Sequence, residues 1–174
     1  MMKRFLCLML AMLVLSGLFG CHYSDSGDIL EPVEYFYPRK SASFIYGSVD
    51  GVFSAEIREA SGHRDDLHYL ISMYLRGPQD SNLRSPFPAN CKLEEIRIED
   101  DTLHIRFSKE FSTLENMDLI LACAALTKTC LSMTDLSYVH ISSHTEGKAF
   151  SIQMDADTIL LADYSAFETQ PKAE

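Results

Sequence analysis

Charged and apolar residues alternate on both sides of an aspartate pair between residues 95 and 106, and this arrangement constrains the fold more than any other feature. If Asp100 and Asp101 form a two-residue turn, the flanking segments pair as antiparallel strands with every apolar residue on one face. The expected inner pairs are Ile98 with Leu103 and Ile96 with Ile105, and the outer pairs are Arg97 with His104 and Glu95 with Arg106. Asp-Asp favours such a turn less than Asp-Gly does, so a loop longer by about one or two residues is the alternative.

A helix is expected over residues 66–76, where apolar residues recur at helical spacing. Asp65 can accept hydrogen bonds from the free N–H groups at its start. Gly77 and Pro78 end this helix, because glycine readily adopts the left-handed conformation after a helix and proline cannot continue one. The proline-rich residues 78–92 are expected to form a loop.

A second helix is expected over residues 117–132, capped by Asn116 or Thr113. Its apolar residues cover so much of the circumference that we expect other elements to cover it on more than one side. Cys123 and Cys130 would lie about 10 Å apart in this helix, which is too far for a disulfide bond. We therefore expect both cysteines to be small buried apolar residues.

Further strands are expected at residues 34–37, with an extension at 44–46, and at 52–58, 136–142 and 149–154. Alternation in the segment 52–58 predicts that Phe53 and Ile57 point inward, and Glu146-Gly147 is the expected turn between the last two strands. The resulting order, ββ-α-ββ-α-ββ, predicts an α+β fold. It would be a single two-layer domain, with two helices on one face of a mixed β-sheet of hairpins.

The N-terminus has the features of a secretory signal peptide, since two basic residues precede an apolar run over residues 5–15 and small residues follow. A bilayer span needs roughly 20 apolar residues, so this run is short for a membrane helix. Residues 18–21, Leu-Phe-Gly-Cys, resemble the lipobox of bacterial lipoproteins. The resemblance implies cleavage after Gly20 and a thioether from Cys21 to a lipid with acyl chains such as palmitate. An uncleaved apolar anchor and an ordinary secreted protein are the alternatives.

Four parts of the chain are therefore predicted: a signal peptide at 1–20, a lipid-anchored tether at 21–33, a folded domain at 34–154 and a C-terminal tail at 155–174. The tether is too polar to fold alone. Each buried acyl CH₂ contributes about 0.8 kcal/mol, so two or three chains would hold the domain on the outer face of the cell membrane.

The chain is acidic, with a formal net charge of −10 that becomes −12 (−10 minus 2) if Lys3 and Arg4 are removed. No basic patch opposes this charge, so nucleic acid is not an expected partner. His140 and His144 have a metal-binding spacing only on a helix, and we expect them on a strand and its turn. Neither a metal nor another cofactor is therefore expected.

Motifs of nucleophilic catalysis and of phosphate binding do not occur in the sequence. The acidic pairs at 65–66, 94–95 and 100–101 could in principle serve in glycan cleavage, but capping and solvation explain them. We expect no enzymatic activity, and a wall hydrolase accessory with weak activity is the least favoured alternative.

Several motifs together resemble the GerMN domain of sporulation and germination lipoproteins. They are Tyr-Leu-Arg-Gly-Pro at 74–78, Pro88, the hairpin at 96–107, then Ser108, Glu110 and Phe111, and Leu126-Thr127 in an alanine-rich helix. The match covers about Glu34 to Met154 and departs at Asp100-Asp101, where the family usually has Asp-Gly. The resemblance implies a Gram-positive, spore-forming source and an extracytoplasmic domain akin to the ring-building modules of secretion and sporulation machines.

On this basis we expect a membrane-anchored module that contacts envelope, sporulation or germination proteins. A peptidoglycan-binding envelope module is the alternative. The candidate partner contacts are Ser108, Lys109, Glu110 and Phe111. A plain turn into the second helix also explains these four residues. Aromatic residues that could stack on a partner, although packing on the sheet is favoured, are Tyr35, Tyr37 and Tyr46.

Overall fold

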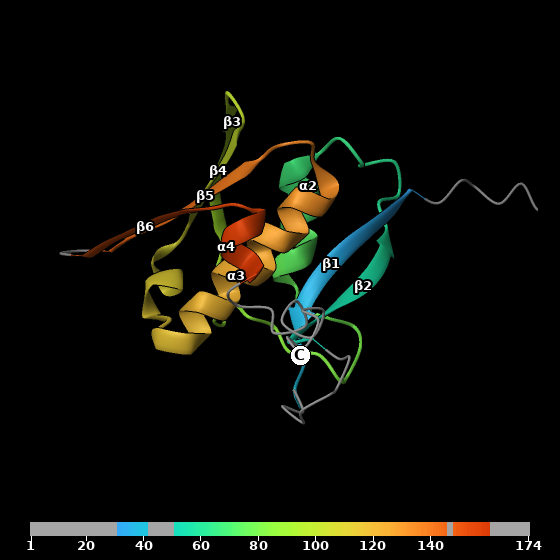
Figure 1. The fold of residues 1–174 in the computed structure, drawn as a ribbon, viewed down its shortest axis with the longest axis horizontal. Helices are drawn as coiled ribbons and strands as arrows, with labels where there is room; N and C mark the ends of the chain where they lie inside the picture. The colour runs from blue at the N-terminus through green and yellow to red at the C-terminus, as the bar shows by residue number, and fades with distance from the viewer. Residues whose placement is uncertain (1–30, 42–50, 146–147, 161–174) are drawn as a thin grey trace, which may run out of the picture. The chain divides into compact units, whose positions relative to one another are not determined.

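The computed structural model describes residues 31–41, 51–145 and 148–160 (Figure 1). Its strands are β1 (Pro32–Pro38), β2 (Phe53–Glu59), β3 (Leu93–Glu99), β4 (Thr102–Phe107), β5 (Tyr138–Thr145) and β6 (Lys148–Met154). Its helices are α2 (Leu67–Leu75), the 3₁₀ helix η1 (Lys109–Thr113), α3 (Asn116–Met133) and α4 (Ala156–Leu160). Within these ranges no helix combines the length and the apolar character needed to cross a bilayer.

The strands form two sheets, one of four strands in the order β3-β4-β5-β6 and one of β1 and β2. The larger sheet is mixed, because β4 and β5 are parallel and its other neighbours are antiparallel. A parallel pair needs a long crossover, which η1 and α3 supply. The predicted α+β class is confirmed, and the structure adds that β1 and β2 form their own sheet on the other side of the helices (Figure 1).

The β3–β4 hairpin has the predicted register, with Glu99 opposite Thr102 and all four predicted pairs in place. Asp100 takes a positive φ of 52°, a conformation that aspartate tolerates better than most residues, so the two-residue turn forms without glycine. One expectation for the inner face is wrong. Ile98 is 54% exposed and lines an open groove beside the start of α2, so its side chain stays uncovered.

Helix α2 begins and ends close to the predicted residues. Its N-cap is Asp66 rather than Asp65, and the Asp66 side chain accepts a hydrogen bond from the Tyr69 N–H at 2.9 Å. Gly77 follows the helix with φ of 85°, in the left-handed conformation that the sequence predicts.

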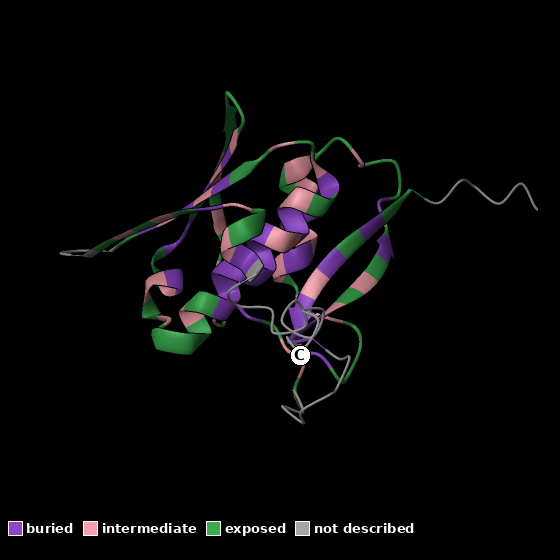
Figure 2. Cartoon of the chain, in the orientation of Figure 1, coloured by how far each residue is buried: buried purple, intermediate pink, exposed green. Residues whose placement is uncertain are grey.

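Helix α3 lies between the two sheets and contacts β1, β5 and α4 (Figure 1). Every residue from 121 to 127 is buried, which confirms that the helix is covered on more than one side (Figure 2). Cys123 and Cys130 are buried and free, as expected. The predicted caps are wrong: Glu115 is the N-cap residue, and the Thr113 hydroxyl donates to the Glu110 carbonyl inside η1.

Strand β2 turns the opposite face inward from the one predicted. Phe53 is buried at its start, but Ile57 is 66% exposed, whereas Arg58 is buried. The inward face of β2 therefore carries the polar residues of the alternation. The reason is that Arg58 has hydrogen-bond acceptors on that side of the strand.

The C-terminal strands β5 and β6 pair antiparallel, as predicted. Beyond β6, the short helix α4 packs against α3 with Ile159 buried. The predicted extension at 44–46, the Glu146-Gly147 turn and Cys21 all lie outside the described residues.

Candidate functional site

The four residues predicted to contact a partner form the connection from β4 into η1. Ser108 and Phe111 are buried, and the Phe111 ring stacks on Phe107 with centroids 5.0 Å apart. Lys109 is exposed and Glu110 is half-buried. Two of the four side chains therefore pack in the interior. Contact with a partner stays a prediction, and only Lys109 and Glu110 are accessible for it.

Ser108 joins three segments through hydrogen bonds. Its N–H donates to the Lys92 carbonyl at 2.9 Å, and its hydroxyl oxygen accepts from the Lys92 N–H at 3.0 Å. The Ser143 hydroxyl on β5 donates to the Ser108 carbonyl at 3.1 Å. The Ser108 hydroxyl also lowers the pKa of the Glu110 carboxyl. The Ser-x-Glu-Phe motif thus fixes η1 against the proline loop and the sheet.

A buried ion pair of Arg58 with Glu56 was missed by sequence reasoning. The two side chains are only 7% and 12% exposed, and the Arg58 Nε donates to Glu56 Oε1 at 2.6 Å. The remaining guanidinium nitrogens donate to the Met73 carbonyl at 3.1 Å and to the Gly77 carbonyl at 2.7 Å. Arg58 therefore donates to carbonyls at and just beyond the C-terminal end of α2, where a positive charge is favourable.

The rest of the pocket around Arg58 is aromatic. The Tyr35 and Tyr37 rings lie 5.1 and 5.6 Å from the guanidinium carbon, and both side chains are buried. Burial raises the pKa of Tyr37. These two tyrosines pack in the interior, as favoured. Tyrosines at alternate positions of β1, opposite a strand with Glu and Arg two residues apart, are the signal that could have indicated this cluster.

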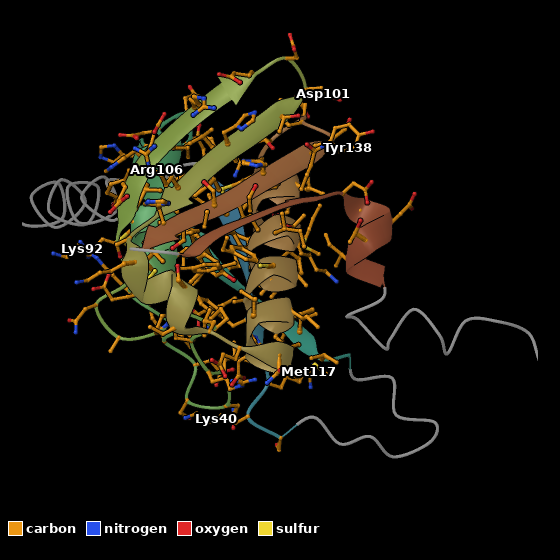
Figure 3. The ribbon with its side chains drawn as sticks, turned by 90° about the vertical axis from the view of Figure 1, so that its left-hand side faces the viewer. Lys40, Lys92, Asp101, Arg106, Met117 and Tyr138 are labelled. Carbon is orange, nitrogen blue, oxygen red and sulfur yellow. The ribbon has the colours of Figure 1, made fainter. Side chains whose placement is uncertain are left out.

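The outer face of the four-stranded sheet carries exposed ion pairs, among them those of Arg106, which Figure 3 labels. A β-bulge at Glu94 sets both Glu94 and Glu95 beside Arg106, whose nitrogens lie 3.5 and 2.7 Å from the two carboxylates. Arg97 pairs with Glu95 at 2.9 Å and with Glu99 at 2.8 Å. Carboxylates therefore compensate both arginines of this face.

His104 and His140 lie side by side on β4 and β5, with ring centroids 4.9 Å apart. Burial, followed by the charges of His104 and Arg97, lowers the pKa of His140, and its Nε2 lies 2.7 Å from the Ser151 hydroxyl. His144 lies four residues further along β5. Across the described ranges, His, Cys, Asp and Glu side chains do not gather in threes that could hold a metal ion.

An open groove of about 590 Å³ lies between β3 and the start of α2, and we call it the β3 groove. Its residues are Gly62, His63, Asp65, Asp66, Leu67, His68, Ile96, Arg97 and Ile98. The floor is apolar, because Ile98 is exposed and Ile96 and Leu67 are half-buried. One wall is acidic, because it carries the exposed carboxylates of Asp65 and Asp66. The sequence identified the two elements but could not place them together.

A family model described as sporulation and spore germination, named Germane, matches residues 35–149. A crystal structure of a "putative lipoprotein" from Clostridium perfringens shares 16% identity with a TM-score of 0.46, covering 72% of this chain and 87% of that one. A search of curated proteins found no significant match. The family match spans most of the folded region and confirms the resemblance drawn from the motifs, so the chain belongs to the Germane family of sporulation and spore germination proteins.

Proposed function

We propose that this protein is a lipid-anchored interaction module that binds a protein partner through the β3 groove, within a sporulation, germination or envelope complex. The observation that carries the proposal is the exposed apolar floor of the groove. Ile98 is 54% exposed and shares the groove with the half-buried Ile96 and Leu67, which together give a partner a contiguous apolar surface to cover.

The location of the module rests on the N-terminal sequence. A basic start, a short apolar run and Cys21 after a small residue are the features of a lipoprotein signal. Lipid on Cys21 would confine the domain to the outer face of the cell membrane, which raises its local concentration near membrane-bound partners.

We propose action by contact rather than by catalysis. The buried carboxylate Glu56 accepts hydrogen bonds from Arg58, Gln79 and Asp80, which leaves it no role as a free base. Burial raises the pKa of the Cys91 and Cys123 thiols to about 12, so both are protonated at neutral pH and poor nucleophiles.

The test is site-specific photo-crosslinking in the host. A photoreactive residue at Ile98 should give a crosslinked product that contains an envelope, sporulation or germination protein. The same residue at Ile57, which is 66% exposed on β2, is the matched control and should not give that product. Equal products at the two positions, or none at Ile98, would remove the groove as the contact site.

Two further measurements separate the parts of the proposal. Cys21→Ser should abolish labelling by a fatty acid and release the protein from the membrane fraction, and persistent labelling would show that the lipid lies elsewhere. Sedimentation of the purified chain with peptidoglycan, at a level unaffected by Ile98→Asp, would favour the wall-binding alternative.

A further inference from the structure

The outer edge of β3 is unpaired, since no described strand lies beyond it in the order β3-β4-β5-β6. The direction of its free backbone groups follows from the hydrogen bonds of β4. The Tyr138 N–H donates to the Asp101 carbonyl at 3.1 Å, so the odd-numbered residues of β4 turn toward β5. Its even-numbered residues therefore turn toward β3, opposite Glu95, Arg97 and Glu99.

Ile96 and Ile98 alternate with those three residues, so their own N–H and C=O groups point away from β4, toward the open edge. Both residues line the β3 groove, together with Arg97. One stretch of strand thus offers free backbone donors and acceptors together with an apolar surface. The bulge at Glu94 interrupts regular pairing before this stretch and leaves residues 96–98 as its regular part.

We propose that a partner protein adds a strand to β3, with apolar side chains in the groove and a lysine or arginine beside Asp65 and Asp66. This inference rests on the proposed function and names the form of the partner. The unpaired edge requires an extended backbone, because a helix has no free backbone groups to offer it.

Charge complementarity selects the flanking residue of the partner. Asp65 and Asp66 are exposed at the groove wall, while Arg97 is already paired with Glu95 and Glu99. Among the described residues of the groove, Arg97 is thus compensated, and the His63 Nδ1 lies 4.0 Å from the Asp66 carboxylate, which leaves Asp65 exposed and without an ion pair. A basic side chain on the added strand would therefore meet a favourable field and an acidic one would be repelled.

A second copy of this chain fits less well. The register that sets Ile96 against Ile98 of the other copy also sets Arg97 against Arg97 and Glu95 against Glu99. Like charges directly opposite each other destabilise a strand pair. The register that instead sets Glu95 against Arg97 brings Glu94 over Ile98, beside the acidic wall.

The test uses the purified full chain in detergent micelles and the synthetic peptide acetyl-Lys-Thr-Ile-Thr-Val-Thr-Lys-amide. This peptide presents Lys, Ile, Val and Lys on one face in either strand direction. Binding should slow amide hydrogen exchange at Ile96 and Ile98 at least tenfold, while amides of β1 and β2 stay unchanged. A version with both lysines replaced by glutamate should bind at least tenfold more weakly. In the lysine peptide, N-methylation at all five residues between the lysines should abolish binding, because it removes the donors that face β3 in either strand direction.

Variants of the protein make the test specific. Ile98→Asp should weaken binding of the lysine peptide at least tenfold, whereas the matched Ile57→Asp should leave it unchanged. Both side chains are exposed, so both variants should keep the wild-type urea midpoint. Asp65→Asn should weaken the lysine peptide severalfold and leave a peptide with threonine at both ends unaffected; Asp66 is avoided because it caps α2.

Three results would overturn strand addition: binding without protection at Ile96 and Ile98, equal binding of the lysine and glutamate peptides, or protection of these amides by self-association without peptide. Failure of the peptides with a persistent crosslink at Ile98 in the host would remove strand addition and leave the proposed function intact. Peptide binding without any crosslink in the host would remove the proposed function and leave the ability of β3 to accept a strand.

Discussion

Two arginine–glutamate pairs in this domain have nearly the same geometry and opposite surroundings. The Arg58 Nε lies 2.6 Å from Glu56 Oε1, and an Arg106 terminal nitrogen lies 2.7 Å from Glu95 Oε2. The side chains of the first pair are 7% and 12% exposed, and those of the second are 47% and 34% exposed. Contact distance therefore says little about what either pair contributes to folding.

Water makes the difference between the two pairs. Removal of Arg106 lets water solvate Glu94 and Glu95 on the open face of the sheet. Removal of Arg58 leaves the Glu56 charge uncompensated and takes a donor from the Met73 and Gly77 carbonyls, in a place that water reaches poorly. A buried charge that loses its partner costs several kcal/mol, whereas an exposed one costs little.

The largest effect is expected from Arg58→Gln, which should lower the free energy of unfolding by about 3–5 kcal/mol. The shorter amide cannot reach the end of α2 and leaves the Glu56 charge uncompensated. Urea denaturation followed by circular dichroism measures this loss. A loss below about 1 kcal/mol would show that water solvates the pair, and the comparison would fail.

Tyr74→Phe tests a neutral hydrogen bond in the same buried region. The Tyr74 hydroxyl donates to the Phe36 carbonyl, and the ring is fully buried. Its removal leaves that carbonyl unpaired, at an expected cost of about 1–2 kcal/mol. Thermal unfolding should show the shift, and Tyr138→Phe, on an exposed side chain, is the control that should melt as the wild type does.

Arg106→Gln is the matched counterpart on the outer face and should cost less than about 1 kcal/mol. The loss should shrink further as salt is added, because exposed charges are screened. Urea denaturation at low and at high salt measures both effects. A salt-independent loss as large as that of Arg58→Gln would mean that this face is covered in the folded protein.

The smallest effect is expected from His140→Gln, and only its pH dependence is diagnostic. The pKa of His140 is lowered by burial, so below the ordinary histidine pKa of about 6.5 the unfolded chain binds the proton more readily than the folded one. The contribution of neutral His140 to folding stability is therefore complete above that pH, and it is lost as the pH falls through the pKa of His140 in the folded protein.

The glutamine variant should accordingly lose less stability than the wild type between about pH 7 and pH 5, with equal stability at neutral pH. Urea midpoints across this range measure the slope. Identical slopes in the two proteins would show that the histidine pair is fully solvated. His68→Gln, on an exposed helix residue, is the control.

The same contrast explains which expectations failed. The register of the β3–β4 hairpin follows from adjacent residues, since the turn and the alternation of side chains are local. In β2 the same alternation marks two faces but does not say which one is covered. Arg58 faces inward because α2 presents its terminal carbonyls there. Ile57 therefore faces solvent, because adjacent residues of a strand point to opposite faces of the sheet.

The candidate site divides in the same way. Residues 108–111 are contiguous, and their role in joining β4 to α3 could be expected from sequence. The β3 groove joins residues 62–68 to residues 96–98, which share no motif and lie about thirty positions apart. A single sequence contains no signal for that juxtaposition, because it depends on how α2 packs against β3.

The amino-acid order by itself determined the β3–β4 turn, the ends of α2, the hairpin register and the family, because these depend on backbone conformation and side-chain spacing within a few residues. Only the tertiary structure decided the division into two sheets, the inward face of β2 and the open edge of β3. Those features depend on which distant surface removes a side chain from water, and burial is a property of the whole packed domain.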